Sequence, residues 1–171
     1  MIHVGILSDT HLSSCSDSFR AQVQTAFAGC EIIIHAGDLT DIAVLDAFSG
    51  KKVYAVHGNM CNMGSRQVLP NSKLITLGGY RIGLFHGAWG PRHTVEERAW
   101  AMFPLADCII YGHTHHAVCH RIGKILFINP GSFQGTGQFG APGTYAILDI
   151  DEQAEKPNGL QAAIHELPPQ S

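Results

Sequence analysis

The chain has 171 residues, of which 45% are apolar and 15% are charged, and its formal net charge at neutral pH is -3. This length and composition predict one globular domain over residues 1–171 and argue against a disordered chain. The net negative charge argues against a protein that holds nucleic acid through a lysine-rich surface, so we expect no stable nucleic-acid binding.

No apolar run approaches the length of a membrane span, and the sequence does not begin with a cationic segment followed by an apolar one. We therefore expect a cytoplasmic protein that does not associate with membranes. The five cysteines are odd in number and include no C-x-x-C pair, which disfavours a disulfide framework or a structural zinc knuckle.

The first third of the chain alternates between apolar runs and amphipathic segments. Three β-branched, mostly apolar runs are predicted to be strands buried on both faces: residues 2–8, 31–35 and 53–56. Two segments between them have apolar residues at helical spacing and are predicted to be helices: residues 16–29 and 40–49. Asp41 stands in the first turn of the second helix, where ordinary capping is one explanation for it.

The rest of the chain is predicted to contain a loop over residues 60–70 and then a β-hairpin. Its strands, residues 73–77 and 80–85, are separated by Gly78-Gly79. Thr94 and Glu97 have capping-box spacing and predict a helix that ends before Pro104. Further strands are expected at residues 108–111, 117–121, 124–128 and 144–149, and residues 151–171 are expected to form a peripheral tail with a strand near 160–165. This order of elements is compatible with a plain doubly wound α/β sheet.

Polar residues of the kinds that bind metals follow five of these runs where each run ends. They are Asp9 and His11, Asp38, Asn59, His86, and His113 with His115. Open α/β sheets place their ligand sites at the carboxyl ends of their strands, so this recurrence predicts one site along one edge. A ligand set of imidazoles, carboxylates and an amide suits first-row divalent ions better than it suits calcium, which prefers oxygen ligands alone. Seven ligands also exceed the four that one tetrahedral zinc needs. We expect two divalent ions, manganese first, with iron, zinc or nickel as alternatives.

The ordered motifs resemble those of the calcineurin-like metallophosphoesterases. They are Asp9-x-His11, Gly37-Asp38-x-x-Asp41, Gly58-Asn59, His86-Gly87 and Gly112-His113-Thr114-His115. With Asn129-Pro130-Gly131-Ser132 after them, the chain is most similar to the YfcE-like phosphodiesterase branch, which is related to the retromer subunit Vps29. The resemblance implies a four-layer αββα sandwich, in which two mixed β-sheets are flanked by helices.

The resemblance also implies roles for individual residues. One ion would be held by Asp9, His11, Asp38 and His115, and the other by Asp38, Asn59, His86 and His113. A hydroxide bridging the ions would attack phosphorus in a phosphodiester, or in an aryl phosphomonoester, with Asp38, Asn59 and His86 as catalytic residues. Asp41 would lie behind the ligands and orient a ligand or the backbone.

The sequence departs from the family pattern at two places. Met60 and Cys61 follow the motif asparagine, where many relatives have histidine or cysteine and then an acidic residue. No arginine follows the Asn-Pro-Gly-Ser motif between residues 133 and 142, so Arg66 and Arg92 are candidates for the phosphate contact. The letters of Gly135-x-Gly137-x-x-Gly140 match a dinucleotide fingerprint, but no βαβ unit surrounds them, and we expect no nucleotide cofactor.

Two other functions are compatible with this fold. A Vps29-like scaffold would present the fold to protein partners with weak or vestigial activity, and Met60 is the feature that favours it. A purely structural metal site is disfavoured because closed sites do not need seven ligands. The partner we expect is a small phosphate ester, and by analogy with relatives the chain would form a dimer or tetramer.

Overall fold

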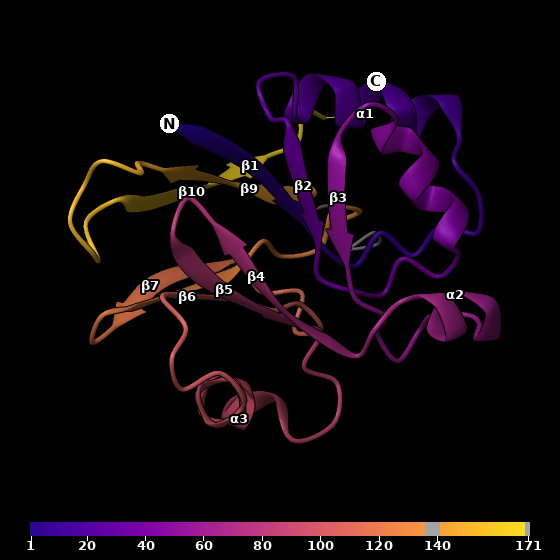
Figure 1. Cartoon of the computed structure of the whole chain (residues 1–171). Coiled ribbons are helices and arrows are strands. Elements are labelled where there is room, and N and C mark those ends of the chain that lie inside the picture. Colours follow the sequence, from indigo (N-terminus) through magenta and orange to yellow (C-terminus); the bar gives the residue numbers. More distant parts are fainter. Residues whose placement is uncertain (136–140, 170–171) are drawn as a thin grey trace.

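The computed structural model describes residues 1–135 and 141–169, and it contains two five-stranded sheets that pack face to face. The strand orders are β10-β9-β1-β2-β3 and β4-β5-β6-β8-β7. Figure 1 shows α1 outside the first sheet and α3 outside the second. This four-layer arrangement confirms the fold implied by the family resemblance, and it corrects the plain doubly wound sheet that the element order alone allowed.

The first sheet is parallel on one side and antiparallel on the other. Strands β1 (Ile2–Leu7), β2 (Ile32–His35) and β3 (Lys52–Ala55) run parallel. Strands β9 (Thr144–Ile150) and β10 (Leu160–Glu166) return antiparallel beside β1. Because β1 has the other sheet on one side and helices on the other, its sequence is a continuous apolar run rather than an alternating one.

The second sheet begins with the expected hairpin of β4 (Ser72–Leu77) and β5 (Tyr80–Phe85). Strands β5, β6 (Cys108–Ile110) and β8 (Ile125–Asn129) run parallel, and β7 (Val118–Ile122) closes one edge antiparallel to β8. The core between the sheets consists of buried aliphatic side chains from both, among them Ile6, Ile34, Ile82, Ile110 and Leu148.

Helices cover the outer faces of both sheets. Helix α1 (Asp17–Ala26) is capped by the Ser16 side chain and packs with the 3-10 helix η1 (Ile42–Phe48) on the first sheet. The short 3-10 helix η2 (Arg92–Thr94) leads into α3 (Val95–Met102), which buries Val95 and Ala99 on the second sheet. No helix in the described ranges is both long enough and apolar enough to cross a bilayer.

Two local predictions were wrong. The predicted loop 60–70 contains helix α2 (Met63–Val68), whose N-cap is Asn62. This helix has no apolar stripe in its sequence, because its buried anchor is the Ser65 hydroxyl, which accepts a hydrogen bond from the Ile42 N–H. The expected capping box is not formed either, since the Thr94 hydroxyl donates to the Pro91 carbonyl and accepts from Arg98 Nε.

The strand predicted near residues 160–165 of the C-terminal tail is present as β10, at one edge of the first sheet. Most of the glycine pattern between residues 135 and 140 lies outside the described residues.

Candidate metal centre

Side chains that follow four strands meet at one edge of the two sheets. Asp9 and His11 follow β1, Asp38 follows β2, His86 follows β5, and His113 and His115 follow β6. They form two groups, in each of which three ligand atoms lie within 4.8 Å of one another: Asp9, His11 and His115, and Asp38, His86 and His113. Of the seven residues expected to bind metals, six are thus brought together in the division that the family resemblance implies.

The first group is centred on the buried carboxylate of Asp9. Its Oδ1 lies 3.1 Å from His115 Nε2 and 3.7 Å from His11 Nε2, and the two imidazole nitrogens are 3.4 Å apart. Burial opposes ionisation of Asp9, but hydrogen bonds with His11 and His115 outweigh it, so the pKa of Asp9 lies well below its ordinary value. Asp9 is therefore a carboxylate at neutral pH, as a metal ligand must be.

The second group adjoins the first through His86. The Nε2 atom of His86 lies 3.1 Å from Asp38 Oδ2 and 3.9 Å from Asp9 Oδ1. The ring of His113 stands at 71° to that of His86, with centroids 5.2 Å apart. The imidazole of His86 thus lies against one carboxylate from each group.

The tautomer of His86 fits a metal ligand. Its Nδ1 donates a hydrogen bond of 2.7 Å to the Ala36 carbonyl, which leaves the lone pair on Nε2. Nε2 is buried, and although Asp38 Oδ2 lies 3.1 Å away, this atom makes no hydrogen bond with any described residue. Burial opposes protonation of this ring, yet Asp38 and Asp9 together raise its pKa, so positive charge is favoured at this point. A divalent ion that accepts the Nε2 lone pair would supply that charge.

The backbone at the site is strained. Asp9, His11, Asp38, His113 and His115 all have φ between 49° and 66°, in the left-handed region that non-glycine residues rarely adopt. Such conformations cost on the order of 1–3 kcal/mol each and persist only where the surroundings impose them. Five of the six non-glycine residues with positive φ in the described ranges are candidate ligands, which indicates that these turns aim side chains at a ligand.

The turns are held by side chains beneath them. Ser8 donates a hydrogen bond of 2.5 Å to Asp9 Oδ2, which also accepts from the His113 N–H. The buried Ser132 hydroxyl donates to the Asp9 carbonyl at 3.1 Å. The neutral ring of His35, whose pKa burial lowers to about 4, accepts from the Gly37 N–H through Nδ1 and contacts the Thr10 hydroxyl through Nε2.

Asn129 fastens the turn that carries His113 and His115. Its amide donates to the Gly112 carbonyl at 3.0 Å and to the Thr114 hydroxyl at 2.9 Å, and its carbonyl oxygen accepts from the Gly131 N–H. The Asn-Pro-Gly-Ser motif therefore supports both groups, through Asn129 on one side and Ser132 on the other.

Replacing Asn129 with alanine is expected to weaken Mn²⁺ binding 10–100-fold, the usual cost of losing a group that orients a ligand. The alanine also leaves a buried carbonyl without its donor, which costs about 1–3 kcal/mol of unfolding free energy. Calorimetric titration and thermal unfolding measure the two effects. Asn71→Ala, at an exposed position, is the matched control and should change neither. Unchanged affinity in Asn129→Ala would mean that the turn holds its shape without this amide.

Asn59 and Asp41 are members of neither group. Asn59 is exposed in the turn after β3, and the next residue, Met60, donates its N–H to Asp38 Oδ1 at 2.7 Å. Asp41 caps η1 by accepting from the Ala43 N–H, and its other oxygen accepts from the Asn62 amide. Asp41 thus orients backbone next to the site, which is compatible with both explanations offered from the sequence.

The two candidate arginines differ in their surroundings. The Arg66 guanidinium donates to the carbonyls of Asn59 and Cys61 and so holds the turn after β3. Arg92 lies close enough to His113 that its charge, after burial and the charge of His86, helps to lower the pKa of that ring. The Arg92 side chain makes no hydrogen bond or ion pair within the described residues, whereas Arg66 is engaged, so Arg92 is the better candidate for an anionic ligand.

Sequence reasoning from the residues did not single out Ser8 or His35, which act through hydrogen bonds to the ligands and to the backbone of the turns. The sequence indicates them only by residue type. A serine or a histidine at the end of an apolar strand needs a hydrogen-bond partner when it is buried.

A family model described as the calcineurin-like phosphoesterase superfamily domain matches residues 2–153. A probable metallophosphoesterase of Methanothermobacter thermautotrophicus is 34% identical over 131 residues, which are 75% of this chain and 76% of the relative. The phosphodiesterase YfcE of Escherichia coli is 33% identical over 106 residues, 58% of this chain and 54% of YfcE. The structure of Vps29 from Cryptosporidium parvum superposes with a TM-score of 0.72 at 19% identity, covering 97% of each chain.

Proposed function

Because this chain belongs to the calcineurin-like phosphoesterase superfamily, we propose that it is a two-metal phosphodiesterase that hydrolyses small phosphate diesters and also accepts aryl phosphomonoesters. That it is a metal-dependent phosphoesterase follows from the family and from relatives named for that activity. The observation that carries the finer proposal is the pair of adjoining three-residue groups, with the unpartnered Nε2 of His86 between the carboxylates of both.

Asp9, His11 and His115 would hold the first ion. Asp38, His86 and His113, together with Asn59, would hold the second, and Asp38 would serve both. When bound, the ions would supply positive charge to the phosphoryl oxygens and acidify a water molecule, the nucleophile of a hydrolysis. We propose manganese as the working metal, because the donors combine imidazoles with carboxylates and an amide.

The chain's own residues then bind and orient the substrate. The His86 ring is fixed by the Ala36 carbonyl and the Asp9 carboxylate by Ser8, so the ligands need little rearrangement. The exposed amide of Asn59 is available to a phosphoryl oxygen beside Asp38. Arg92 adds a cation next to His113, which attracts a phosphodiester anion.

Relatives named as phosphoesterases favour this enzyme over a Vps29-like scaffold, since the likeness to Vps29 concerns the fold alone. The test is hydrolysis of bis(4-nitrophenyl) phosphate and of 4-nitrophenyl phosphate by metal-stripped protein, with and without added Mn²⁺. We expect turnover that depends on Mn²⁺, binding of two ions per chain, and faster cleavage of the diester. Protein that binds two ions and cleaves neither ester would overturn the proposal.

The leaving group is expected to matter because Met60 occupies the position after Asn59. Met60 is 57% exposed, and its backbone N–H donates a hydrogen bond to Asp38 Oδ1. A thioether cannot donate a proton, and general-acid help is typically worth about 10²–10⁴ in rate. The enzyme should therefore cleave aryl esters well and alkyl esters poorly.

Met60→His is expected to raise kcat for an alkyl diester at least about tenfold and to change kcat for an aryl diester little. The gain should follow the protonation of the new imidazole in a pH profile. Met63→His is the matched control, because Met63 is 75% exposed at the start of α2. Equal rates on the alkyl ester for all three proteins would show that a missing acid at residue 60 does not limit turnover.

A further inference from the structure

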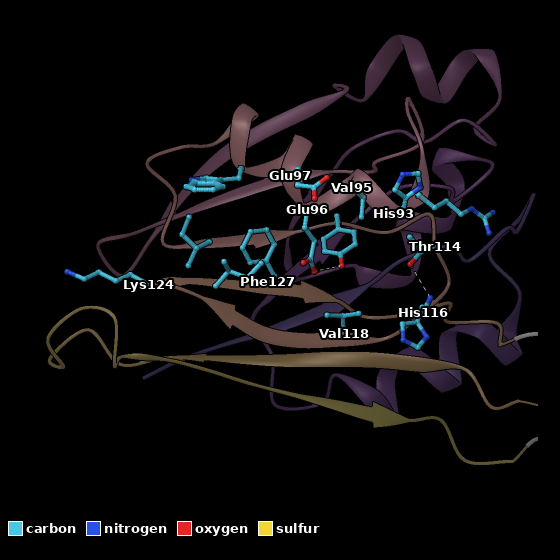
Figure 2. Close-up of a pocket in the computed structure, with 15 residues that line it drawn as sticks. His93, Val95, Glu96, Glu97, Thr114, His116, Val118, Lys124 and Phe127 are labelled. Carbon is cyan, nitrogen blue, oxygen red and sulfur yellow. Dashed lines mark hydrogen bonds between the residues drawn. The ribbon is translucent and has the colours of Figure 1, made fainter.

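A cavity of about 810 Å³ lies between α3 and the outer face of the second sheet. This volume is within the range of small-molecule sites in proteins. Its lining is mainly apolar, with Val118, Ile125 and Phe127 from the sheet and Val95 and Trp100 from the helix. Figure 2 shows Val95 of the helix above the strands that carry Val118 and Phe127.

One end of the cavity borders the candidate metal centre. Thr114, which lines that end, stands between the ligands His113 and His115 in the sequence, and His116 follows directly after them. Arg92 lines the cavity as well. Figure 2 places Thr114 and His116 at the opposite end from Lys124. A molecule with its phosphate at the metals can therefore extend an organic group into this space.

The wall of the cavity is already organised. Glu96 Oε1 accepts a hydrogen bond of 2.8 Å from the Tyr111 hydroxyl and lies 2.8 Å from His120 Nε2. These two contacts tie α3 to β7 and to the end of β6, across the cavity. Because the helix is held at this separation by Glu96, the hollow beside it does not have to be opened by a ligand.

The charges at the rim fit a small anionic ester. The side chains of Arg92, Glu97 and Lys124 have no hydrogen bond or ion pair within the described part of the chain. Two of these three side chains are cations, which favour an anionic ligand. The apolar middle offers Trp100, 57% exposed, whose indole gains contact area when an aromatic ring covers it.

We propose that this cavity is the subsite for the organic group of the phosphate ester, and that it selects an aromatic group, which packs against Trp100, Ile125 and Phe127. The inference rests on the proposed function, because it takes the metal centre as the place of the phosphate. It adds the substrate class: diesters with an aromatic group on the ester oxygen that is not cleaved.

The test compares two diesters that share 4-nitrophenolate as leaving group. One carries a methyl group as its other substituent, and the other carries a 2-naphthylmethyl group. Because the same bond breaks in both, the ratio of their kcat/KM values reports how the second group is bound. We expect a ratio of at least about ten in favour of the naphthylmethyl ester, and a fall of at least fivefold in that ratio in Trp100→Ala. The matched control is Leu105→Ala, since Leu105 is 68% exposed and does not line the cavity.

The outcomes separate the two proposals. Absence of turnover for the methyl ester in manganese-loaded protein would overturn the proposed function. Turnover of both esters with a ratio near one, or a ratio that Trp100→Ala leaves unchanged, would overturn only the subsite.

A second measurement uses no catalysis. 2-Naphthylmethanol added to metal-free protein should shift the methyl NMR signals of Val95, Val118 and Ile125, and Trp100→Ala should weaken its binding about tenfold. Shifts confined to other residues would overturn the proposal. Sedimentation tests the alternative occupant: a dimer that Trp100→Ala dissociates would mean that the cavity receives a second copy of the chain instead.

Discussion

Asp38→Asn should lower kcat/KM for a phosphodiester by on the order of a thousandfold and remove one metal ion from the protein. Losing a group that merely orients a ligand costs 10–100-fold, and Asp38 is proposed as a ligand that both ions share. Its Oδ2 lies 3.1 Å from His86 Nε2, and its Oδ1 accepts from the Met60 N–H, so the carboxylate also positions the second group. An amide keeps the size but not the charge.

Asparagine is the appropriate replacement because the backbone at residue 38 has φ of 54°, which asparagine tolerates better than alanine. Metal content by elemental analysis, steady-state kinetics and thermal unfolding without metal would be measured together. Asp46→Asn is the control, since Asp46 is an exposed carboxylate of η1. If the Asp38 variant kept two ions and wild-type kinetics, Asp38 would not be a ligand.

The positions of the candidate ligands could be predicted from the sequence because each follows a strand. The end of an apolar run such as residues 31–35 marks where a buried strand leaves the sheet, and Asp38 follows three residues later. Parallel neighbours share that edge, so separate strand ends converge without any knowledge of side-chain geometry. The assignment of ligands to two ions came from the family resemblance, which implied two sets of four that share Asp38. The two groups of three in the structure are subsets of those sets.

The number of sheets could not be predicted from the apolar runs. Pairing is nonlocal: β9 returns to lie beside β1 although more than a hundred residues separate them, and β6 pairs with β8 instead of its neighbour β7. A run of apolar residues indicates that a strand is buried, but it does not indicate which strand pairs with it.

Helix α2 was missed for a related reason. Its six residues, Met-Gly-Ser-Arg-Gln-Val, contain no helical stripe of apolar side chains. It is stabilised by its N-cap, Asn62, which accepts from the Ser65 N–H. Two further hydrogen bonds, from the Ile42 N–H to the Ser65 hydroxyl and from the Asn62 amide to Asp41, join residues about twenty positions apart. Polar contacts of this kind become visible only when the fold brings the segments together.

Gly58, in the turn after β3, is not a candidate ligand, but its lack of a side chain shapes the metal centre. A Cβ atom at Gly58 would overlap Asp38 Oδ1 and would lie 2.7 Å from both the Asp38 amide nitrogen and His86 Cδ2. Real Cβ atoms do not approach other atoms this closely, and two of the three neighbours belong to proposed ligand side chains. The residue has to be glycine so that the turn carrying Asn59 can lie against Asp38.

Gly58→Ala is therefore expected to displace the Asp38 carboxylate and to lower kcat/KM about a hundredfold or more, with weaker binding of the second ion. Overpacking should also cost about 1–3 kcal/mol of unfolding free energy in metal-free protein. Gly64→Ala is the matched control: it adds the same methyl group in α2, where the nearest atom to the new Cβ is 3.7 Å away. It should keep activity and slightly stabilise the helix, since alanine is the better helix former. Thermal unfolding and circular dichroism establish that both variants fold before metal titration and kinetics are compared. A folded Gly58→Ala protein that binds two ions and retains full activity would show that the turn after β3 can move away from Asp38, and that the close approach is not needed for catalysis.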